Sequence, residues 1–311
     1  MHFKIKYFLI TFSIRMKNKY SFKIFENSTF KHLRLPFSFF LLPVFLFALS
    51  QSNPVNWPHA IIAFAILHLL IFPSSNGYNS YQDKDETSIG GMKHPPKVTK
   101  NLFYVTLGMD LAGILSALFV SVYFSILVLI FILVSRAYSY RKLRLKKYAI
   151  IGFLTVFVFQ GAFVYLMTSA AITTTSFTQF FTLNNIICMS IASLFIGSIY
   201  PLTQIYQHEA DKKDGVISIS YKLGYIGTFV FSGILFAIAT LLLFYYFSLK
   251  HQQFDLVLFI IIILPAAYYL TVWFNKVRNN TVHANFENTM KMNLLTSVCM
   301  NLYFSILIFI N

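Results

Sequence analysis

Residues 225–249 read YIGTFVFSGILFAIATLLLFYYFSL, a stretch without a single charged side chain. A helix that crosses the ~30 Å hydrocarbon core of a bilayer needs about 20 mostly apolar residues, so this stretch predicts a membrane-spanning helix. The whole chain of 311 residues is 57% hydrophobic, 18% aromatic and 11% charged, whereas soluble domains are about 25% charged. The composition therefore excludes an ordinary soluble domain.

Eight further apolar stretches follow the same rule and bring the number of predicted spans to nine. We therefore expect an all-α membrane protein whose helices surround a central cavity, with no separate soluble domain. The nine predicted helices are Phe37–Ser50, His59–Ser75, Leu102–Leu118, Val120–Ala137, Tyr148–Thr168, Phe180–Ile205, Tyr225–Leu249, Phe254–Phe274 and Leu294–Ile310.

The basic residues occupy alternate connections between these helices. Lys and Arg accumulate in cytoplasmic loops, and here they precede the first helix and follow the second, fourth, sixth and eighth. The connections 51–58 and 169–179 carry no charge. We therefore expect a multi-pass protein of a bacterial inner (plasma) membrane. Its N-terminus and long polar loops would be cytoplasmic, and Asn311 would lie outside.

The N-terminal segment is unusually basic. Residues 1–34 hold eight Lys and Arg side chains around one short apolar stretch, 7–12. Cations interrupt this stretch too often for the core of a signal peptide. We expect a basic cytoplasmic arm over residues 1–34, with a start at Met16 left open, and a polytopic membrane domain over residues 35–311.

A polar loop follows the second predicted helix. Asn79 and Asp83 are four residues apart, so they share one face if that helix continues past its apolar part. Asp85 and Glu86 come directly after them. Two oxygen ligands at this spacing can share one Mg²⁺, which prefers carboxylates, amide carbonyls, waters and phosphate oxygens.

A second acidic cluster follows the sixth predicted helix and contains Gln207, Glu209, Asp211 and Asp214. Six of the 10 acidic residues of the chain lie in these two loops, about half a chain apart and on the same predicted face. Either cluster alone is as well explained by acids that offset local lysines. The pair favours a functional site at the cytoplasmic mouth.

The loop 135–147, after the fourth predicted helix, is strongly basic. The accumulation of cations in cytoplasmic loops explains this charge by itself. The functional interpretation adds that Tyr138 and Lys146 face a diphosphate held between the two acidic loops.

Asp110 lies inside the predicted helix Leu102–Leu118, where an ionisable side chain is costly. It is either a functional group or a structural hydrogen-bond partner of a neighbouring helix, for example of Gln160 or Asn184. We favour the structural role.

In these loops the sequence resembles the UbiA superfamily of intramembrane prenyltransferases, and the resemblance covers nearly the whole chain. The first motif of the family has the form N-D-x-x-D-x-x-x-D. Asn79 and Asp83 fall on its first Asn and on its first spaced Asp. Ser80 replaces the adjoining Asp, and Thr87 stands where the last Asp is expected.

The second motif of the family is D-x-x-x-D, followed by Gly, a Thr/Ser-rich stretch and Leu-Gly. Gln207 replaces the leading Asp, and Glu209 stands at a middle position where many members also have an acid. The matching positions are Asp211, Gly215, Ser218, Leu223 and Gly224.

Two shorter segments add to the resemblance. Tyr138, followed by Leu145-Lys146-Lys147, resembles a Tyr and Leu-Lys-Arg segment of the family, and Lys93 resembles the basic residue after its first motif. The resemblance implies catalytic roles for Asp83, Asp211, Lys146 and Tyr138. It implies metal ligation by Asn79, Asp83, Glu209 and Asp211, and substrate contacts by Asn79, Lys93, Glu209 and Lys146.

The implied reaction is Mg²⁺-dependent transfer of a polyprenyl group from a polyprenyl diphosphate to a small acceptor, which we expect to be aromatic, in the synthesis of quinones or related lipids. Aromatic faces would stabilise the allylic cation, and the candidates near the mouth are Tyr78, Tyr81, Tyr138 and Tyr206. A small-molecule transporter and a non-catalytic lipid- or quinone-binding member of the family are the alternatives. No nucleic-acid partner is expected, because no basic stripe with interleaved aromatics is present.

Overall fold

The computed structural model describes residues 27–173 and 180–310. In these ranges the regular structure is helical, apart from one isolated bridge between Ile89 and Met92. Eight helical segments there are long and apolar enough to span a membrane, and a ninth apolar helix, Asn101–Ala117, is shorter. The prediction of an all-α membrane protein with nine spans is confirmed. Most of the predicted basic arm, part of the loop 169–179 and Asn311 lie outside the described residues.

The first four spans include two that are divided into consecutive helical pieces. Proline lies in the first turn of several of these pieces, where its missing N–H removes no helical hydrogen bond. The first span consists of α2 (Ser28–Leu33), η1 (Leu35–Phe40) and α3 (Leu42–Ser50), and the second of α4 (Trp57–Ala65), η2 (Ile66–Ile71) and α5 (Phe72–Asp83). They are followed by α6 (Asn101–Ala117) and α7 (Val122–Ser139).

The remaining spans include the two longest, and the second acidic cluster lies among them. A short 3₁₀ turn, η3 (Leu145–Lys147), leads into α8 (Ala149–Val156), η4 (Phe157–Ala162) and α9 (Phe163–Ile172). The sixth span, α10 (Leu183–Thr203), continues into η6 (Ile205–Gln207) and α11 (His208–Lys213). The chain ends with α12 (Ile219–Leu249), α13 (Gln253–Asn279), η7 (Thr281–His283) and α14 (Phe286–Ile310).

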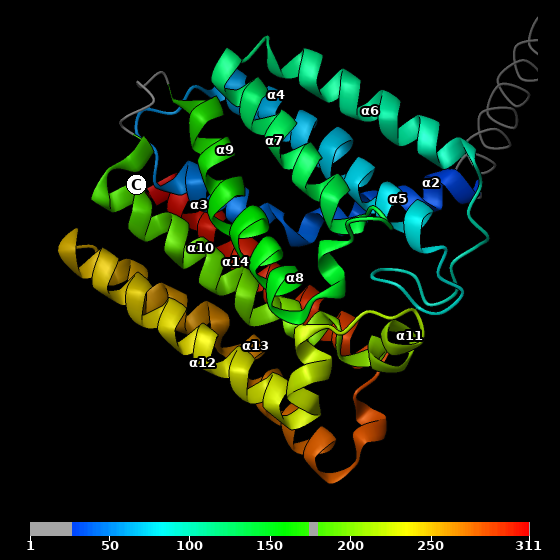
Figure 1. The fold of residues 1–311 in the computed structure, drawn as a ribbon. Coiled ribbons are helices and arrows are strands. Elements are labelled where there is room, and N and C mark those ends of the chain that lie inside the picture. Colours follow the sequence, from blue (N-terminus) through cyan, green and yellow to red (C-terminus); the bar gives the residue numbers. More distant parts are fainter. Residues whose placement is uncertain (1–26, 174–179, 311) are drawn as a thin grey trace, which may run out of the picture.

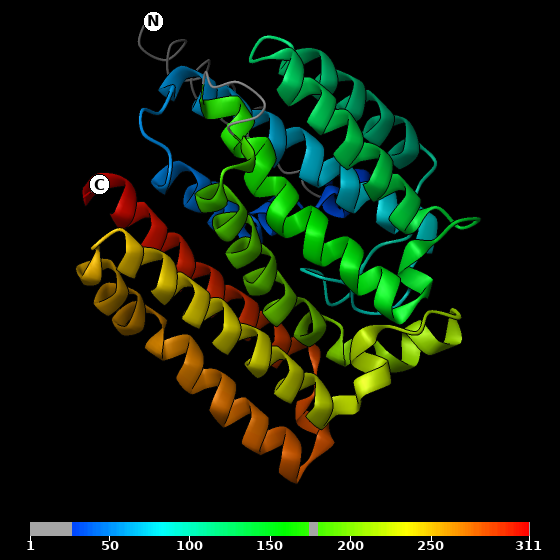
Figure 2. The same cartoon turned by 60° about the vertical axis from the view of Figure 1, so that its left-hand side comes forward.

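These helices form one bundle (Figures 1 and 2). In it α10 packs against α12, α13 against α14, and α14 against α3 near the start of the chain. At its centre the buried ring of Phe47 stacks on Phe304 and contacts Tyr165. The loops after α5 and α7 lie with α11 at one end of the bundle, and the C-terminal end of α14 lies at the other (Figure 1). The two acidic clusters therefore share one end, as the alternation of charges predicts.

Asp110 takes part in a closed polar network between helices. It is 6% exposed, accepts a hydrogen bond of 2.6 Å from Ser74 of α5, and forms an ion pair with Arg136 of α7. The Arg136 guanidinium also lies 3.9 Å from the centre of the Tyr78 ring. The predicted interhelical hydrogen bond is thus confirmed, but Gln160 and Asn184 were the wrong partners. Helix α6 packs between α5 and α7, so Asp110 faces these two helices.

Candidate active site

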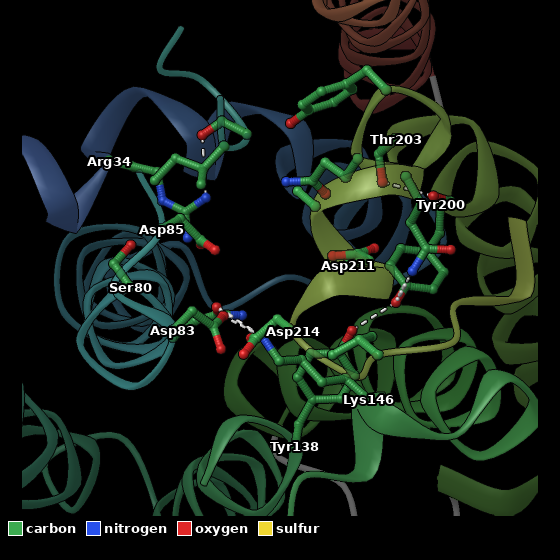
Figure 3. A pocket seen from close by; sticks show the side chains of 18 of the residues that line it. Arg34, Ser80, Asp83, Asp85, Tyr138, Lys146, Tyr200, Thr203, Asp211 and Asp214 are labelled. Atoms are coloured by element: carbon green, nitrogen blue, oxygen red, sulfur yellow. Dashed lines mark hydrogen bonds and ion pairs between the residues drawn. The ribbon is translucent and has the colours of Figure 1, made fainter. Parts of the chain in front are cut away.

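A polar cavity of about 170 Å³ opens at the loop end of the bundle. Its walls come from η1, the end of α5 with the loop that follows, α7, η3, α10 and α11 (Figure 3). Both predicted acidic loops and the basic loop therefore contribute to one cavity. Of the predicted site residues, those that line it are Asn79, Asp83, Tyr138, Lys146 and Asp211.

The first acidic cluster is placed by the last turn of α5. This helix extends through Asp83 and ends at Lys84, whose φ of 54° is left-handed. Asn79 and Asp83 consequently lie one turn apart on the cavity side. The helical spacing predicted from sequence is correct for these two residues.

Asp83 is not a free carboxylate. It is 9% exposed and forms ion pairs with both Arg144, at 3.3 Å, and Lys146. The Lys146 ammonium also donates to Asn79 Oδ1 at 3.4 Å. Arg144 has a left-handed φ of 46°, directly before η3, and this bend turns both cations of the basic loop toward the cavity.

Asp214 is paired in the same way. Arg144 bonds to one of its carboxylate oxygens and Arg141 to the other, at 3.2 Å. Although partial burial acts in the opposite direction, the hydrogen bond and charge of Arg144 lower the pKa of Asp214. This carboxylate therefore stays ionised and holds the basic loop in place.

The second acidic cluster is shaped by two glycines in conformations that other residues rarely adopt. Gly215 has a φ of 70°, and the turn there lets the Val216 N–H donate to the Asp211 carbonyl at 2.8 Å. Gly224 has φ 68° and ψ 177° and breaks the helical path within α12. Glycine adopts positive φ at the lowest steric cost, which gives a physical reason for glycine at these two positions of the motif.

Asp85 and Asp211 are the acids lining the cavity that form no ion pair. They project into it from opposite walls (Figure 3). Within residues 27–173 and 180–310, no hydrogen bond or ion pair to either carboxylate is found. Burial and the neighbouring Asp83 raise the pKa of Asp85 to about 6, against the opposing effect of Lys146 and Arg34. Because burial and Asp83 disfavour the ionised form of Asp85, a cation bound beside it would stabilise that form.

The donor set fits Mg²⁺ bound together with a phosphate ligand. The described residues contain no group of three His, Cys, Asp or Glu side chains able to enclose a metal by themselves. Mg²⁺ is usually held by one or two carboxylates, with waters and phosphate oxygens completing its shell. Asp85 and Asp211, with the amide oxygen of Asn79 nearby, meet this requirement.

Arg34 is a cation that sequence analysis assigned only to the basic arm. Its guanidinium lines the cavity and donates to two carbonyl oxygens, those of Gly90 at 3.2 Å and Asn76 at 3.1 Å. No described carboxylate forms an ion pair with it, and its Nε is buried without a hydrogen bond. The charges of Asp85 and Asp83 act on this guanidinium, but neither carboxylate forms an ion pair with it. A partly buried cation without an ion pair favours a bound anion on this side of the cavity.

Tyr138 lies at the inner wall in a chain of hydrogen bonds. Its hydroxyl is 2.6 Å from that of Tyr200, which accepts from the Gln204 amide at 2.8 Å (Figure 3). Tyr206 lines the same cavity. Aromatic rings and bound anions can therefore share this space.

Several candidates lie elsewhere. Glu209 is exposed on α11 and does not line the cavity. Lys93 is also outside it, 56% exposed and paired with Glu287. Tyr78 is covered by Arg136, and Tyr81 packs on Phe103 with ring centres 5.4 Å apart.

Sequence reasoning left several cavity residues out of the proposed site, among them the charged or hydrogen-bonded side chains of Arg34, Asp85, Arg144, Tyr200 and Asp214. Asp85 and Asp214 lie in the two acidic loops, but the motif spacing assigned the site to Asp83 and Asp211 instead. The only signal for Arg34 was a cation placed two residues before Pro36, at the start of an apolar stretch.

The fold and this cavity define the class as a polytopic helical membrane protein with a charged pocket at one end. The chain belongs to the UbiA prenyltransferase family, whose model matches residues 37–295, more than half of its length. No curated protein matches it significantly.

Solved structures confirm the fold. A UbiA homologue from Aeropyrum pernix K1 without ligand has a TM-score of 0.65 and 15% identity, over 88% of this chain and 98% of that one. A homologue from Archaeoglobus fulgidus bound to GPP and Mg²⁺ has a TM-score of 0.63 and 16% identity, over 91% and 100%. A digeranylgeranylglyceryl phosphate synthase has a TM-score of 0.57 and 18% identity, over 91% and 96%.

Proposed function

We propose that the protein transfers an isoprenyl group from an isoprenyl diphosphate to a small lipophilic acceptor inside the membrane, in the synthesis of quinones or related lipids. The observation that carries this proposal is the charge pattern of the cavity. Two unpaired carboxylates, Asp85 and Asp211, lie in one cavity with the unpaired cation Arg34. A metal–diphosphate complex supplies both missing charges.

In this reaction each cavity residue has a defined task. Arg34 and Lys146 bind diphosphate oxygens and stabilise the negative charge that grows as the allylic C–O bond breaks. Asp85, Asp211 and Asn79 would hold the Mg²⁺, whose charge would offset part of the negative charge on the diphosphate. Asp83 positions Lys146 and Arg144 through its two ion pairs. The ring faces of Tyr138 and Tyr206 stabilise the allylic cation.

An apolar pocket between α3, α10 and α14 suits the isoprenyl tail. It is lined by side chains such as Phe40, Val44, Phe195 and Phe304. Phe37 and Phe40 lie on the same short helix, η1, and line the polar cavity and the apolar pocket respectively. Burying each CH₂ of a tail contributes about 0.8 kcal/mol, so the tail adds affinity while the head group sets position.

The proposal places this cavity at the cytoplasmic face of the inner membrane. The distribution of Lys and Arg supports this orientation, because the basic connections lie at the cavity end of the bundle. A relative of the same fold bound to GPP and Mg²⁺ supports the choice of donor and metal.

The test is Mg²⁺-dependent binding of geranylgeranyl diphosphate and of a longer polyprenyl diphosphate to the purified protein in detergent. We expect saturable binding that disappears with EDTA and in Asp211→Asn. Asn is nearly isosteric with Asp, so this variant removes the charge and little else. The exposed Glu209→Gln serves as the matched control and should bind normally.

Absence of binding at both chain lengths would overturn the proposed donor site. Binding without turnover for any acceptor would instead favour the non-catalytic alternative, to which the neutral Gln207 at a motif position gives some support.

A further inference from the structure

A second chamber adjoins the cavity on the side of α5, α7 and η4. It shares Asn79 and Tyr138 with the cavity, so these two side chains form the partition between the two spaces. The Tyr138–Tyr200 hydrogen bond holds one side of this partition in place (Figure 3). A molecule in the chamber would therefore lie next to whatever the cavity binds.

The lining of the chamber is polar but uncharged. Its hydrogen-bonding groups are the side chains of Ser75, Asn76, Ser135, Ser139, Thr155 and Gln160. Phe131, Val134, Val156 and Phe159 supply apolar surface. No Asp, Glu, Lys or Arg of the described ranges lines it. This combination differs from the cavity next to it, where cations and carboxylates dominate.

Gln160 is the best-placed polar group in this chamber. It lies in the π-helical segment η4, and such segments occur frequently at functional sites. The adjacent Gly161 allows close contact with α10, since an added Cβ would lie 2.4 Å from Ser193 Cα. No hydrogen bond to the Gln160 amide is found among residues 27–173 and 180–310, so its donor and acceptor are available to a ligand.

Charged ligands are disfavoured in this chamber. Two cations near this chamber are already engaged, Arg136 with Asp110 and Lys146 with Asp83. Lys147, the other cation of η3, does not line the chamber. Removing a carboxylate from water without a cationic partner is strongly unfavourable. A diphosphate in the adjoining cavity and the carboxylate of Asp83 would repel it further.

We propose that this chamber holds the acceptor, and that the acceptor is a neutral hydroxylated ring without a carboxylate or phosphate group. This inference rests on the proposed function. Ring hydroxyls would exchange hydrogen bonds with Gln160 and the chamber's serines, and Phe131 and Phe159 would contact the ring.

The transfer across the partition balances without a further reactant. The bond between C1 of the isoprenyl group and the diphosphate oxygen breaks, and its electron pair leaves with the diphosphate. C1 then forms a bond to a ring carbon or hydroxyl oxygen of the acceptor. The proton that this atom loses passes to a diphosphate oxygen.

The experiment uses two probes that differ in one group, methylhydroquinone and 2,5-dihydroxybenzoate. Binding of each is measured by equilibrium dialysis against the protein in nanodiscs, with geranylgeranyl diphosphate and Mg²⁺ present. We expect methylhydroquinone to bind at least about tenfold more tightly, since only the second probe carries a charge to be buried. Equal or reversed preference, or no saturable binding of either probe while the donor binds, would overturn the inference.

Variants at Gln160 sharpen this test. Gln160→Leu should weaken methylhydroquinone about tenfold, because the chamber loses its free amide, with donor affinity unchanged. Gln160→Lys should reverse the preference in favour of 2,5-dihydroxybenzoate. The exposed Gln253→Leu at the start of α13 is the control and should change neither. A Gln160→Lys protein that keeps the original preference would place the acceptor elsewhere.

Donor binding separates this inference from the proposed function. If geranylgeranyl diphosphate does not bind to the wild-type protein, the proposed function fails. If it binds and the carboxylated probe is preferred, only the inference about the acceptor fails.

Discussion

Two groups of ionisable side chains lie in this bundle, and they differ in how completely they are paired. Asp110 and Arg136 satisfy each other and Ser74, with no cavity between them. At the loop end, Asp83 and Asp214 are likewise paired, but Asp85, Asp211 and Arg34 face a common cavity without an ion pair. The same residue types therefore neutralise one another in one place, and in the other they leave charges that a charged ligand would neutralise.

The difference teaches how to separate structural from functional charges in a membrane protein. An ionisable residue within a span is a functional candidate by default, yet Asp110 has every partner that it needs. A ligand site is marked instead by charged side chains that line a cavity and form no ion pair. Variants of the Asp110–Arg136 pair should therefore change stability, whereas variants of the cavity residues without ion pairs should change ligand binding.

The largest effect is expected for the buried pair of Asp110 and Arg136. Asp110→Ala removes one partner of a buried ion pair and leaves Arg136 uncompensated, which should cost on the order of 3–5 kcal/mol of unfolding free energy. The measurement is reversible unfolding in mixed micelles. A double variant, Asp110→Leu with Arg136→Met, should recover most of the loss, and an unstable double variant would refute the closed-pair interpretation.

Asp211→Asn is expected to have the next largest effect, and on activity alone. Losing a charged metal ligand should lower kcat/KM on the order of 10²-fold, while the unfolding midpoint stays within error of wild type, since no ion pair is broken. Steady-state rates and unfolding are measured on the same preparation. Full activity in this variant would remove Asp211 from the site.

Arg34→Gln tests the unpaired cation. Loss of one charge–charge contact should weaken diphosphate binding about tenfold. Stability of the ligand-free protein should change little, because the loss of two hydrogen bonds to backbone carbonyls is offset by removal of a partly buried charge that has no ion pair. Binding isotherms and unfolding curves give both values. Reduced stability with normal affinity would show that Arg34 is a structural residue.

The smallest effect is expected at the predicted site residues that lie outside the cavity. Glu209→Gln and Lys93→Gln should each change kcat/KM by less than about twofold, as exposed charges contribute little. A loss of tenfold or more in either variant, measured with the same acceptor and donor, would mean that the loops close over the substrate and bring these side chains in.

Much of the site followed from the sequence because its motif positions are set by local structure. Asn79 and Asp83 share a helical face through the spacing of four, and Gly215 and Gly224 occupy turns that demand positive φ. Local spacing could not show which carboxylates are already paired. That depends on Arg144 and Lys146, which approach from a loop about sixty residues away.

The sequence by itself determined the membrane-spanning helices, their number and the end of the bundle where polar chemistry gathers, because hydrophobic length and charge distribution are properties of the linear chain. Only the tertiary structure decided that Arg34 enters the cavity, that Asp110 pairs with Arg136, and that Gln160 faces a neutral chamber. These outcomes depend on the relative rotation of packed helices, and helix packing, not the hydropathy of any one segment, sets that rotation.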